Sequence, residues 1–246
     1  VPVLSVVGLH KAYRMGARVL AVRQNLHLTV APGEMLVIVG PCGSGKTTLL
    51  NCISGVDPPD AGEVRVAGAA VDYGREQART ALRRDRIGMV FQFFNLIPSL
   101  TVRENIALPF LIAGHQGAEA DGRVERLLGE VGLEARRDHY PFQLSGGEMQ
   151  LASIARALVR GPSLLLADEP TGNVNPAAGS AIMEILRGTA VREGAGVLMV
   201  THSPEHASWA DRICFIRGGR VVSRLEQGGR RGEVAAIHER LQEMGI

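Results

Sequence analysis

A glycine-rich run from Gly40 to Thr48 constrains this chain more than any other feature. The residues before it, Met35 to Val39, are all apolar and mostly β-branched, which is typical of a buried strand. The residues after it, Thr48 to Ser54, have the pattern of a helix that ends at Gly55. A strand, a glycine-rich turn and a helix in this order predict an α/β sheet that holds an anion at the end of one strand.

The run fits the pattern G-x-x-x-x-G-K-[ST] at every fixed position. Its glycines let backbone N–H groups point inward, and the helix N-terminus adds a partial positive charge. Lys46 is expected to contact the β- and γ-phosphates of a nucleotide, and the Thr47 hydroxyl to bind Mg²⁺. A chance match in a glycine-rich chain is the alternative, but strand, loop and helix all stand where the motif requires them. We predict nucleoside triphosphate binding by Gly40, Pro41, Cys42, Gly43, Ser44, Gly45, Lys46, Thr47 and Thr48.

Composition excludes several other classes of protein. The 246 residues include 46% hydrophobic and 21% charged residues, the mixture of a globular protein. A net charge of +2 is too small to indicate a nucleic-acid surface. No window approaches the roughly 20 apolar residues of a membrane span, and residues 1–8 do not read as a signal peptide. Any membrane role is therefore expected to need a separate chain.

The order of strand and helix patterns predicts an α/β protein with a mostly parallel sheet. Alternating patterns also predict a separate antiparallel sheet, with its last strand at an edge. Parallel strands are expected at 35–39, 87–91, 163–167 and 197–201, and helices at 48–54, 75–86, 146–159, 177–187 and 233–244. Antiparallel strands are expected at 3–7, 19–30 and 63–67, and residues 9–13 either continue the first strand or open a loop. A helical lobe is expected at 93–145, and a hairpin of 212–216 with 220–222.

Two acidic residues follow one of the buried strands. The apolar run from Leu164 to Ala167 ends in Asp168 and Glu169. Such a strand can bring Asp168 beside the glycine-rich loop, where it can hold Mg²⁺ directly or through water. Glu169 is then placed to polarise a water molecule for attack on the γ-phosphate. A solvated loop is the alternative for paired acids at a strand end, and the phosphate-binding loop upstream favours the catalytic interpretation.

The segment Leu144-Ser145-Gly146-Gly147-Glu148 points to a family. Ser145 is a good helix cap, and the two glycines allow close approach of the backbone to an anion. Together with Gln92, Asp168-Glu169 and His202 in this order, the segment makes the chain resemble the nucleotide-binding subunit of an ABC transporter. The resemblance covers nearly the whole length. It implies a single P-loop ATPase domain, 1–246, whose core with its antiparallel subdomain is 1–92 and 160–246, and whose helical subdomain with the signature motif is 93–159.

The resemblance also implies roles that spacing alone does not give. In the family, Ser145, Gly146, Gly147 and Glu148 close over an ATP held by a second copy of the chain, which implies a homodimer with ATP and Mg²⁺. Tyr13 matches the residue that stacks on adenine, Gln92 the residue that reaches Mg²⁺ and the attacking water, and His202 the residue that contacts the γ-phosphate. A core tyrosine, a strand-end polar residue and a structural histidine are the alternatives. The implied catalytic residues are Glu169, His202, Gln92 and Lys46, and the implied metal ligands are Thr47, Gln92 and Asp168.

Within the family the chain looks closest to lipoprotein-release and macrolide-export cassettes, through residues 92–105, 141–147 and 171–173. This implies a membrane permease partner with a large extracytoplasmic domain, and a location at the cytoplasmic face of the cell membrane. The apolar stretch 93–101 is expected partly to pack inside the helical lobe and partly to form a groove for that partner. The alternative is a soluble ABC ATPase that acts on nucleic acid or ribosomes.

Three positions depart from the family pattern. Asn175 replaces the usual aspartate, Leu151 a common arginine, and Ser203 a common aspartate. The resemblance gives the aspartate a part in communication between the two ATP sites. We therefore expect real but slower ATP hydrolysis, with nucleotide binding intact.

Overall fold

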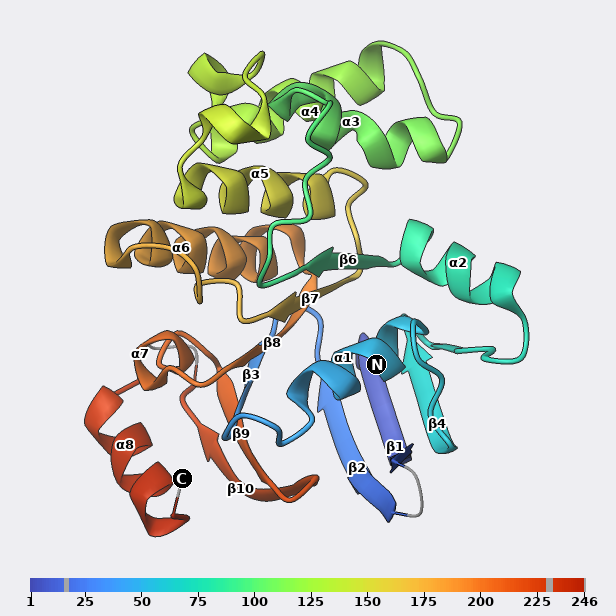
Figure 1. The fold of residues 1–246 in the computed structure, drawn as a ribbon, viewed down its shortest axis with the longest axis vertical. Helices are drawn as coiled ribbons and strands as arrows, with labels where there is room; N and C mark the ends of the chain where they lie inside the picture. Colours follow the sequence, from blue (N-terminus) through green and yellow to red (C-terminus); the bar gives the residue numbers. More distant parts are fainter. Residues whose placement is uncertain (16–17, 229–231, 246) are drawn as a thin grey trace.

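The computed structural model describes residues 1–15, 18–228 and 232–245. A lobe of helices lies above a six-stranded sheet, and a smaller sheet lies beside that sheet near the N-terminus (Figure 1). The predicted combination of an α/β core, an antiparallel β subdomain and helices inserted between strands is confirmed. Among the described residues, no helix is both long enough and apolar enough to cross a bilayer.

The larger sheet has the strand order β10-β9-β3-β8-β7-β6, and all neighbours are parallel except β9 and β10. Its central strands are buried throughout because helices or the smaller sheet cover both faces. Its strands are β3 (Met35–Val39), β6 (Ile87–Val90), β7 (Leu164–Asp168), β8 (Gly196–Thr201), β9 (Arg212–Arg217) and β10 (Arg220–Glu226).

The smaller, antiparallel sheet has the order β2-β1-β4-β5. Its strands are β1 (Leu4–Met15), β2 (Arg18–Val30), β4 (Ala61–Val66) and β5 (Ala69–Ala70). The prediction that the third strand lies at an edge is wrong, because β4 lies between β1 and β5. Alternating burial is the same for an inner and an outer strand of such a sheet, and the two-residue β5 is too short to recognise. The first strand continues past Gly8 through shifts of register, which is the first of the two alternatives for residues 9–13.

The helices follow the predicted order. They are α1 (Lys46–Ser54), α2 (Glu76–Asp85), α3 (Val102–Ile112), α4 (Ala118–Glu130), α5 (Gly146–Leu158), α6 (Pro176–Glu193), α7 (Pro204–Ala207) and α8 (Val234–Glu243), with 3₁₀ turns at Glu134–Arg136 and Pro141–Gln143. Helix α1 begins at Lys46, two residues earlier than predicted. Helix α6 is longer than predicted and ends where Gly194 adopts a left-handed conformation. Helix α7 was not predicted, because four residues are too few to display a helical period.

Two apolar clusters hold the core together, one on each face of the larger sheet. Met35, Val37 and Val39 face a cluster that includes residues of the helical lobe, α6 and α8. Leu36 and Ile38 face a second cluster that includes α1 and the antiparallel sheet. Strand β3 is thus fixed from both sides, and its carboxyl end holds the glycine-rich loop in place.

Candidate functional site

The glycine-rich loop connects the end of β3 to the start of α1. Gly43 and Gly45 have φ angles of 76° and 82°, a left-handed conformation that glycine adopts without strain. At Gly40 a Cβ atom would lie only 2.5 Å from the carbonyl oxygen of Ile216 on β9, so this position has no room for a side chain. The sequence pattern therefore reflects two separate demands, a curled backbone and close packing against β9.

Lys46, the first residue of α1, is buried and folds back over this loop. Its ammonium donates hydrogen bonds to the carbonyl oxygens of Gly40 at 2.7 Å and Pro41 at 3.1 Å. These bonds hold the cation beside the backbone amides of the loop and the N-terminus of α1. Positive charge is therefore concentrated at one point of the sheet edge.

A cavity of about 360 Å³ brings the loop together with the acidic residues and Gln92. It is lined by Cys42, Gly43, Gly45, Lys46, Thr47, Thr48, Gln92, Asp168 and Glu169. Strands β6 and β7 deliver the last three of these residues, because the carboxyl ends of parallel strands meet at one edge of the sheet. The cavity thus offers a cation and N–H donors together with carboxylates.

The oxygen atoms of Thr47, Gln92 and Asp168 suit a magnesium ion. Burial raises the pKa of the Asp168 carboxyl and the charge of Glu169 adds to this, while a hydrogen bond from Thr47 and the charge of Lys46 oppose it. Mg²⁺ prefers a few protein oxygens and fills its remaining positions with water and phosphate oxygens. The described residues contain no cluster of three or more His, Cys, Asp or Glu that would form an all-protein cage. A hydroxyl, an amide and one carboxylate therefore fit an ion shared with a bound phosphate.

Two residues hold the Glu169 side chain: Thr201, the last residue of β8, and His202, which follows it. The Nδ1 atom of His202 lies 3.0 Å from the Glu169 carboxylate, and the Thr201 hydroxyl donates to the same carboxylate at 3.2 Å. The backbone of Glu169 has a φ of 45°, which is uncommon for a residue with a side chain. The left-handed turn directs the carboxylate back toward β8. His202 itself does not line the cavity, so it reaches the site through Glu169.

Hydrogen bonds between loops fix the position of Gln92 relative to Asp168 and Glu169 at the end of β7. The side-chain amide of Asn173 donates to the carbonyl oxygen of Gln92 at 2.9 Å. Gln150, on α5 and only 1% exposed, donates to the carbonyl oxygens of Phe91 at 3.1 Å and Pro170 at 2.7 Å. Sequence analysis did not identify Gln150. A polar side chain on the buried face of a helix was the available signal.

The segment Ser145–Glu148 forms the start of α5 and does not line the cavity. Ser145 caps the helix, since its hydroxyl accepts from the Glu148 amide, and the Glu148 carboxylate accepts from the Ser145 amide at 2.8 Å. Gly147 packs tightly, because a Cβ there would lie 2.7 Å from the Cβ of Ala178 on α6. Among the described residues that line the cavity, none belongs to Ser145–Glu148. Tyr13, on β1, is also outside that lining and is 37% exposed.

Several curated proteins resemble this chain along most of its length. LolD of Maricaulis maris, named as a lipoprotein-releasing system ATP-binding protein, is 46% identical over 220 residues, covering 89% of this chain and 96% of LolD. LolD of Chromohalobacter salexigens is 44% identical over 214 residues, covering 87% and 90%. The macrolide export ATP-binding/permease protein MacB 1 of Aeromonas hydrophila is 42% identical over 222 residues, which are 90% of this chain but 34% of MacB 1.

Solved structures agree with these relatives. The dimeric, post-hydrolysis structure of the ATP-binding cassette MJ0796 with ADP and Pi has a TM-score of 0.83 and 38% identity, covering 91% of this chain and 98% of that one. A family model described as ABC transporter matches residues 23–172, more than half of the chain. The chain therefore belongs to the ABC transporter family, as an ATP-binding subunit that hydrolyses ATP.

Proposed function

We propose that two copies of this chain close around two ATP molecules, head to tail, and that this closure drives a separate membrane permease. The observation that carries the proposal is the composition of the cavity. It holds a phosphate-binding loop, a magnesium-binding oxygen set and a carboxylate, but lacks Ser145–Glu148. That segment presents a helix N-terminus and close-packed glycines, which suit phosphate, but it does not line this cavity. A second copy can bring the two halves together.

Within each half-site we assign roles by position. Gly40–Thr48 binds the phosphates through backbone amides, and Lys46 releases its loop carbonyls to contact the β- and γ-phosphates. Thr47, Gln92 and Asp168 hold Mg²⁺, which when bound neutralises charge on the phosphates. Tyr13 stacks on the adenine. In the closed dimer, with two chains and two ATP molecules, Ser145, Gly146, Gly147 and Glu148 of the second copy lie on the far side of the same phosphates.

Hydrolysis in this proposal depends on Glu169 as the general base. Its carboxylate accepts a proton from the attacking water. His202 and the Thr201 hydroxyl orient the carboxylate. The proposal also gives His202 a contact with the γ-phosphate, although His202 does not line the cavity of the single chain. Gln92 holds the water and the metal from the opposite side, and Asn173 fixes the Gln92 backbone. Cleavage removes the γ-phosphate that joins the two copies, so the dimer reopens.

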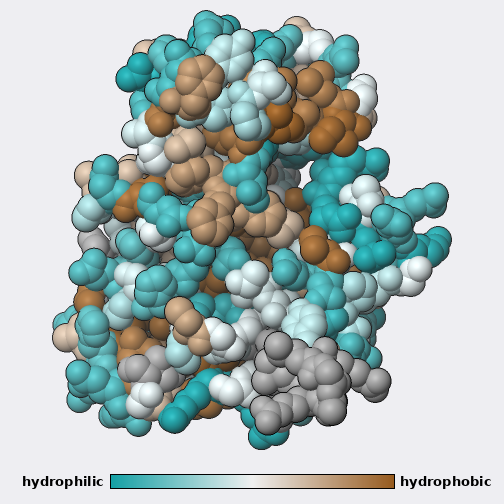
Figure 2. Space-filling view, viewed as in Figure 1, coloured by the Kyte–Doolittle hydropathy of each residue, from teal (hydrophilic) through white to brown (hydrophobic). Residues whose placement is uncertain are grey.

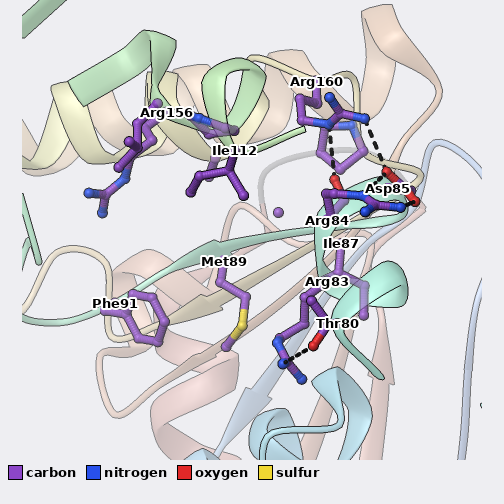
Figure 3. Close-up of a pocket in the computed structure, with 15 residues that line it drawn as sticks. Thr80, Arg83, Arg84, Asp85, Ile87, Met89, Phe91, Ile112, Arg156 and Arg160 are labelled. Atoms are coloured by element: carbon purple, nitrogen blue, oxygen red, sulfur yellow. Dashed lines mark hydrogen bonds and ion pairs between the residues drawn. The ribbon is translucent and has the colours of Figure 1, made fainter. Parts of the chain in front are cut away.

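We place the permease in a groove between α2, β6, α3 and α5 (Figure 3). The groove has a volume of about 430 Å³, and Figure 3 shows Ile112 on the side of the helical lobe and Met89 on the side of β6. Figure 2 shows a hollow between the helical lobe and α2, with hydrophobic residues above it. None of residues 93–101, where a groove was expected, lines this one; Leu96 packs on the core, whereas Phe93 is 70% exposed. A short amphipathic helix is the kind of partner that such a groove receives.

The division into a core, 1–92 and 160–246, and a helical subdomain, 93–159, is part of this proposal. So is a location at the cytoplasmic face of the cell membrane, through the permease. The names of the relatives LolD and MacB support a permease of the lipoprotein-release or macrolide-export type. A large extracytoplasmic domain of that permease is part of the proposal and rests on the resemblance alone. The alternative, action on nucleic acid or ribosomes, is not favoured, because the matches are transporter subunits and the net charge is only +2.

Mixing two inactive variants tests the shared site. Lys46→Ala disables the phosphate-binding half and Ser145→Ala the opposite half. Each variant alone is expected to show little ATP hydrolysis. If the halves come from different copies, a mixed dimer contains one intact site, and mixing restores phosphate release. If both halves came from one chain, mixing would restore nothing, and the head-to-tail proposal would be wrong. Wild type mixed with each variant is the control for subunit exchange.

A further inference from the structure

One carboxylate joins Tyr13 to a buried lysine on the same strand. Asp57 accepts a hydrogen bond from the Lys11 ammonium at 2.6 Å through Oδ1, and one from the Tyr13 hydroxyl through Oδ2. Lys11 is buried, and its ammonium also donates to the carbonyl oxygen of Pro58 at 2.8 Å. Both oxygens of this carboxylate are thus used, one by a cation and one by the phenol.

Asp57 is itself attached to the helix that begins at the phosphate-binding loop. The backbone amides of Val56 and Asp57 donate to the carbonyl oxygen of Asn51, in the last turn of α1, at 3.0 and 3.2 Å. Gly55 ends that helix in a left-handed conformation. The position of the carboxylate therefore follows the position of α1. Since the first turn of α1 contributes to phosphate binding, Asp57 connects the aromatic ring to the element that would hold the phosphates.

The charges favour this arrangement at neutral pH. Burial alone would raise the pKa of Asp57, but hydrogen bonds from Lys11 and Tyr13 lower it overall. Burial alone would lower the pKa of Lys11, but its hydrogen bond to Asp57 and the charge of Asp57 raise it overall. Burial and the hydrogen bond to Asp57 raise the pKa of the Tyr13 phenol overall, although a side-chain hydrogen bond with Thr48 and the charge of Lys11 lower it. The carboxylate therefore stays ionised, the lysine stays charged and the phenol keeps its proton to donate.

The ring of Tyr13 is held at its hydroxyl and on one face. The Lys11 ammonium lies over the ring, 5.2 Å from its centroid, at a distance suited to a cation–π contact. Tyr13 as a whole residue is 37% exposed, so a ligand can reach it. A free tyrosine would lose rotational freedom on stacking, whereas a ring that is already fixed has less to lose.

We propose that Asp57 and Lys11 are positioning residues that fix the ring of Tyr13 for stacking on the nucleotide base. This inference rests on the proposed stacking of Tyr13 on adenine. It adds that a carboxylate outside the phosphate-binding motif sets the affinity for the base. Binding of the phosphates should not depend on it.

Calorimetric titration of the full chain with Mg·ADP and with Mg·pyrophosphate separates the contribution of the base to affinity from that of the phosphates. Neither ligand is hydrolysed by the proposed reaction. Tyr13→Phe keeps the ring and removes only the hydroxyl, and Asp57→Asn keeps the shape and removes the charge. Each is expected to bind ADP about two- to tenfold more weakly, the factor expected for ordering one side chain. Pyrophosphate binding should stay unchanged. The double variant should bind ADP no more weakly than the weaker single variant.

Asp60→Asn is the matched control. Asp60 lies in the same loop and accepts from the Ala12 amide at 2.7 Å, rather than from Lys11 or Tyr13. The Asp60→Asn variant should bind ADP as wild type does. Tyr13→Ala tests the stacking itself: if this variant binds ADP as wild type does, the proposed role of Tyr13 fails. If Tyr13→Ala weakens ADP binding but Asp57→Asn does not, or if Asp57→Asn weakens both ligands equally, the positioning role is overturned.

Discussion

Glu169 illustrates how far one side chain depends on its neighbours. It stands at the end of β7, but Thr201 and His202 at the end of β8 determine where its carboxylate points. Removing its ability to accept a proton should leave this geometry in place. The consequences for binding and for hydrolysis can therefore be measured separately.

Glu169→Gln is expected to lower the rate of phosphate release by about 10²- to 10⁴-fold, the usual contribution of a general base. ATP binding should persist, so the variant should accumulate as a dimer on size-exclusion chromatography in the presence of Mg·ATP. Glu205→Gln, at an exposed glutamate on α7, is the control and should retain activity. Equal turnover by wild type, assayed with its partner, and by Glu169→Gln would contradict the role of Glu169.

Cys42 offers a chemical probe of the cavity. It is exposed and lines the cavity, whereas Cys52 and Cys214 are buried. A maleimide should react with Cys42 first and inhibit hydrolysis, and Mg·ATP should slow this reaction by covering the thiol. Mass spectrometry of the labelled chain measures the rate, and Cys42→Ser is the control. Labelling at the same rate with and without Mg·ATP would count against nucleotide binding beside this residue.

His206 should make stability depend on pH. It contacts the Thr171 hydroxyl at 2.8 Å, and burial lowers its pKa despite the charges of Glu205 and Glu169. The unfolded chain then takes up a proton near pH 6.5 and the folded chain only at lower pH. The free energy of unfolding should therefore fall as pH drops below about 6.5.

Urea unfolding at pH 7.5 and 5.5 measures this effect in wild type and in His206→Gln. The variant lacks the titrating ring, so its midpoint should fall less between the two pH values. An equal fall in both proteins would exclude His206 as the cause.

Most residues of the cavity could be predicted from the sequence, because the spacing within a motif is enough to identify them. Lys46, Thr47 and Asp168 belong to this class. Gln150 and Asp57 do not, since each acts through hydrogen bonds to segments far away in the chain. No local pattern distinguishes them from other polar residues. The roles of all these residues in ATP hydrolysis stay predictions until the variants are measured.

At the scale of elements, α3 and α5 begin in the same way. Thr101 with Glu104, and Ser145 with Glu148, each form a reciprocal pair of side-chain to backbone hydrogen bonds at the helix start. The two caps differ in their expected ligand. Only Ser145, at the start of α5, belongs to the signature segment, which is expected to contact ATP. Comparing the two helices therefore distinguishes the effect of losing a cap from the effect of losing a nucleotide contact, within one chain.

Thr101→Ala and Ser145→Ala should each lower the free energy of unfolding by about 1 kcal/mol, the typical value of a helix cap. Chemical denaturation measures this loss. Only Ser145→Ala should also prevent dimer formation with Mg·ATP, which is best measured in the Glu169→Gln background. If Thr101→Ala abolished the ATP-dependent dimer to the same extent, loss of stability would explain both results.

Element prediction succeeded where burial was uniform and failed where the structure bends or is very short. Strands such as β3 and β8 are apolar throughout, so a short run identified them. Strand β1 continues through Gly8 because its backbone bulges there, which the alternation of side chains cannot reveal. The loop before α3 was expected to pack partly, and the buried Asn105 explains how it does. Its side chain bonds the backbone of Ile97, Leu100 and Thr101.

At the scale of the molecule, the helical lobe and the core meet at the groove proposed for the permease. The groove wall includes Arg160, which bonds Asp85 at 3.0 Å, and Arg156, which bonds the carbonyl oxygen of Asn95 at 2.7 Å. These bonds run from Arg160, just after α5, to α2, and from Arg156 on α5 to the segment after Gln92. A helix seated there would contact residues that connect to the cavity.

Ile112→Asp should disrupt this contact, because Ile112 is an apolar residue that is 70% exposed and lines the groove. Basal hydrolysis by the isolated chain should be unchanged, whereas co-purification with the permease should be lost. Val191→Asp is the control, since Val191 is 64% exposed on α6 and does not line the groove. Equal loss of co-purification in both variants would place the permease elsewhere or point to a general effect of added charge.

The fold class and family were predictable, because the motifs and their order extend over the whole chain. The departures from the family pattern also became clearer. Asn175 caps α6 by accepting from the Ala178 amide at 2.9 Å, and Ser203 caps α7. Leu151 packs on the apolar core. Each thus has a structural place, whereas its effect on turnover depends on the dimer, which a single chain does not contain.

The strand order has a consequence for how the protein is made. Strand β3, which ends in the phosphate-binding loop, pairs only with β8 and β9 in the larger sheet. A ribosome that has released the first half of the chain has therefore delivered this loop without either neighbouring strand. Pairing over such long sequence separations is slow, and unpaired strand edges invite aggregation during that interval. The most recognisable stretch of the sequence is thus completed late, when Gly196–Thr201 and Arg212–Arg217 have emerged.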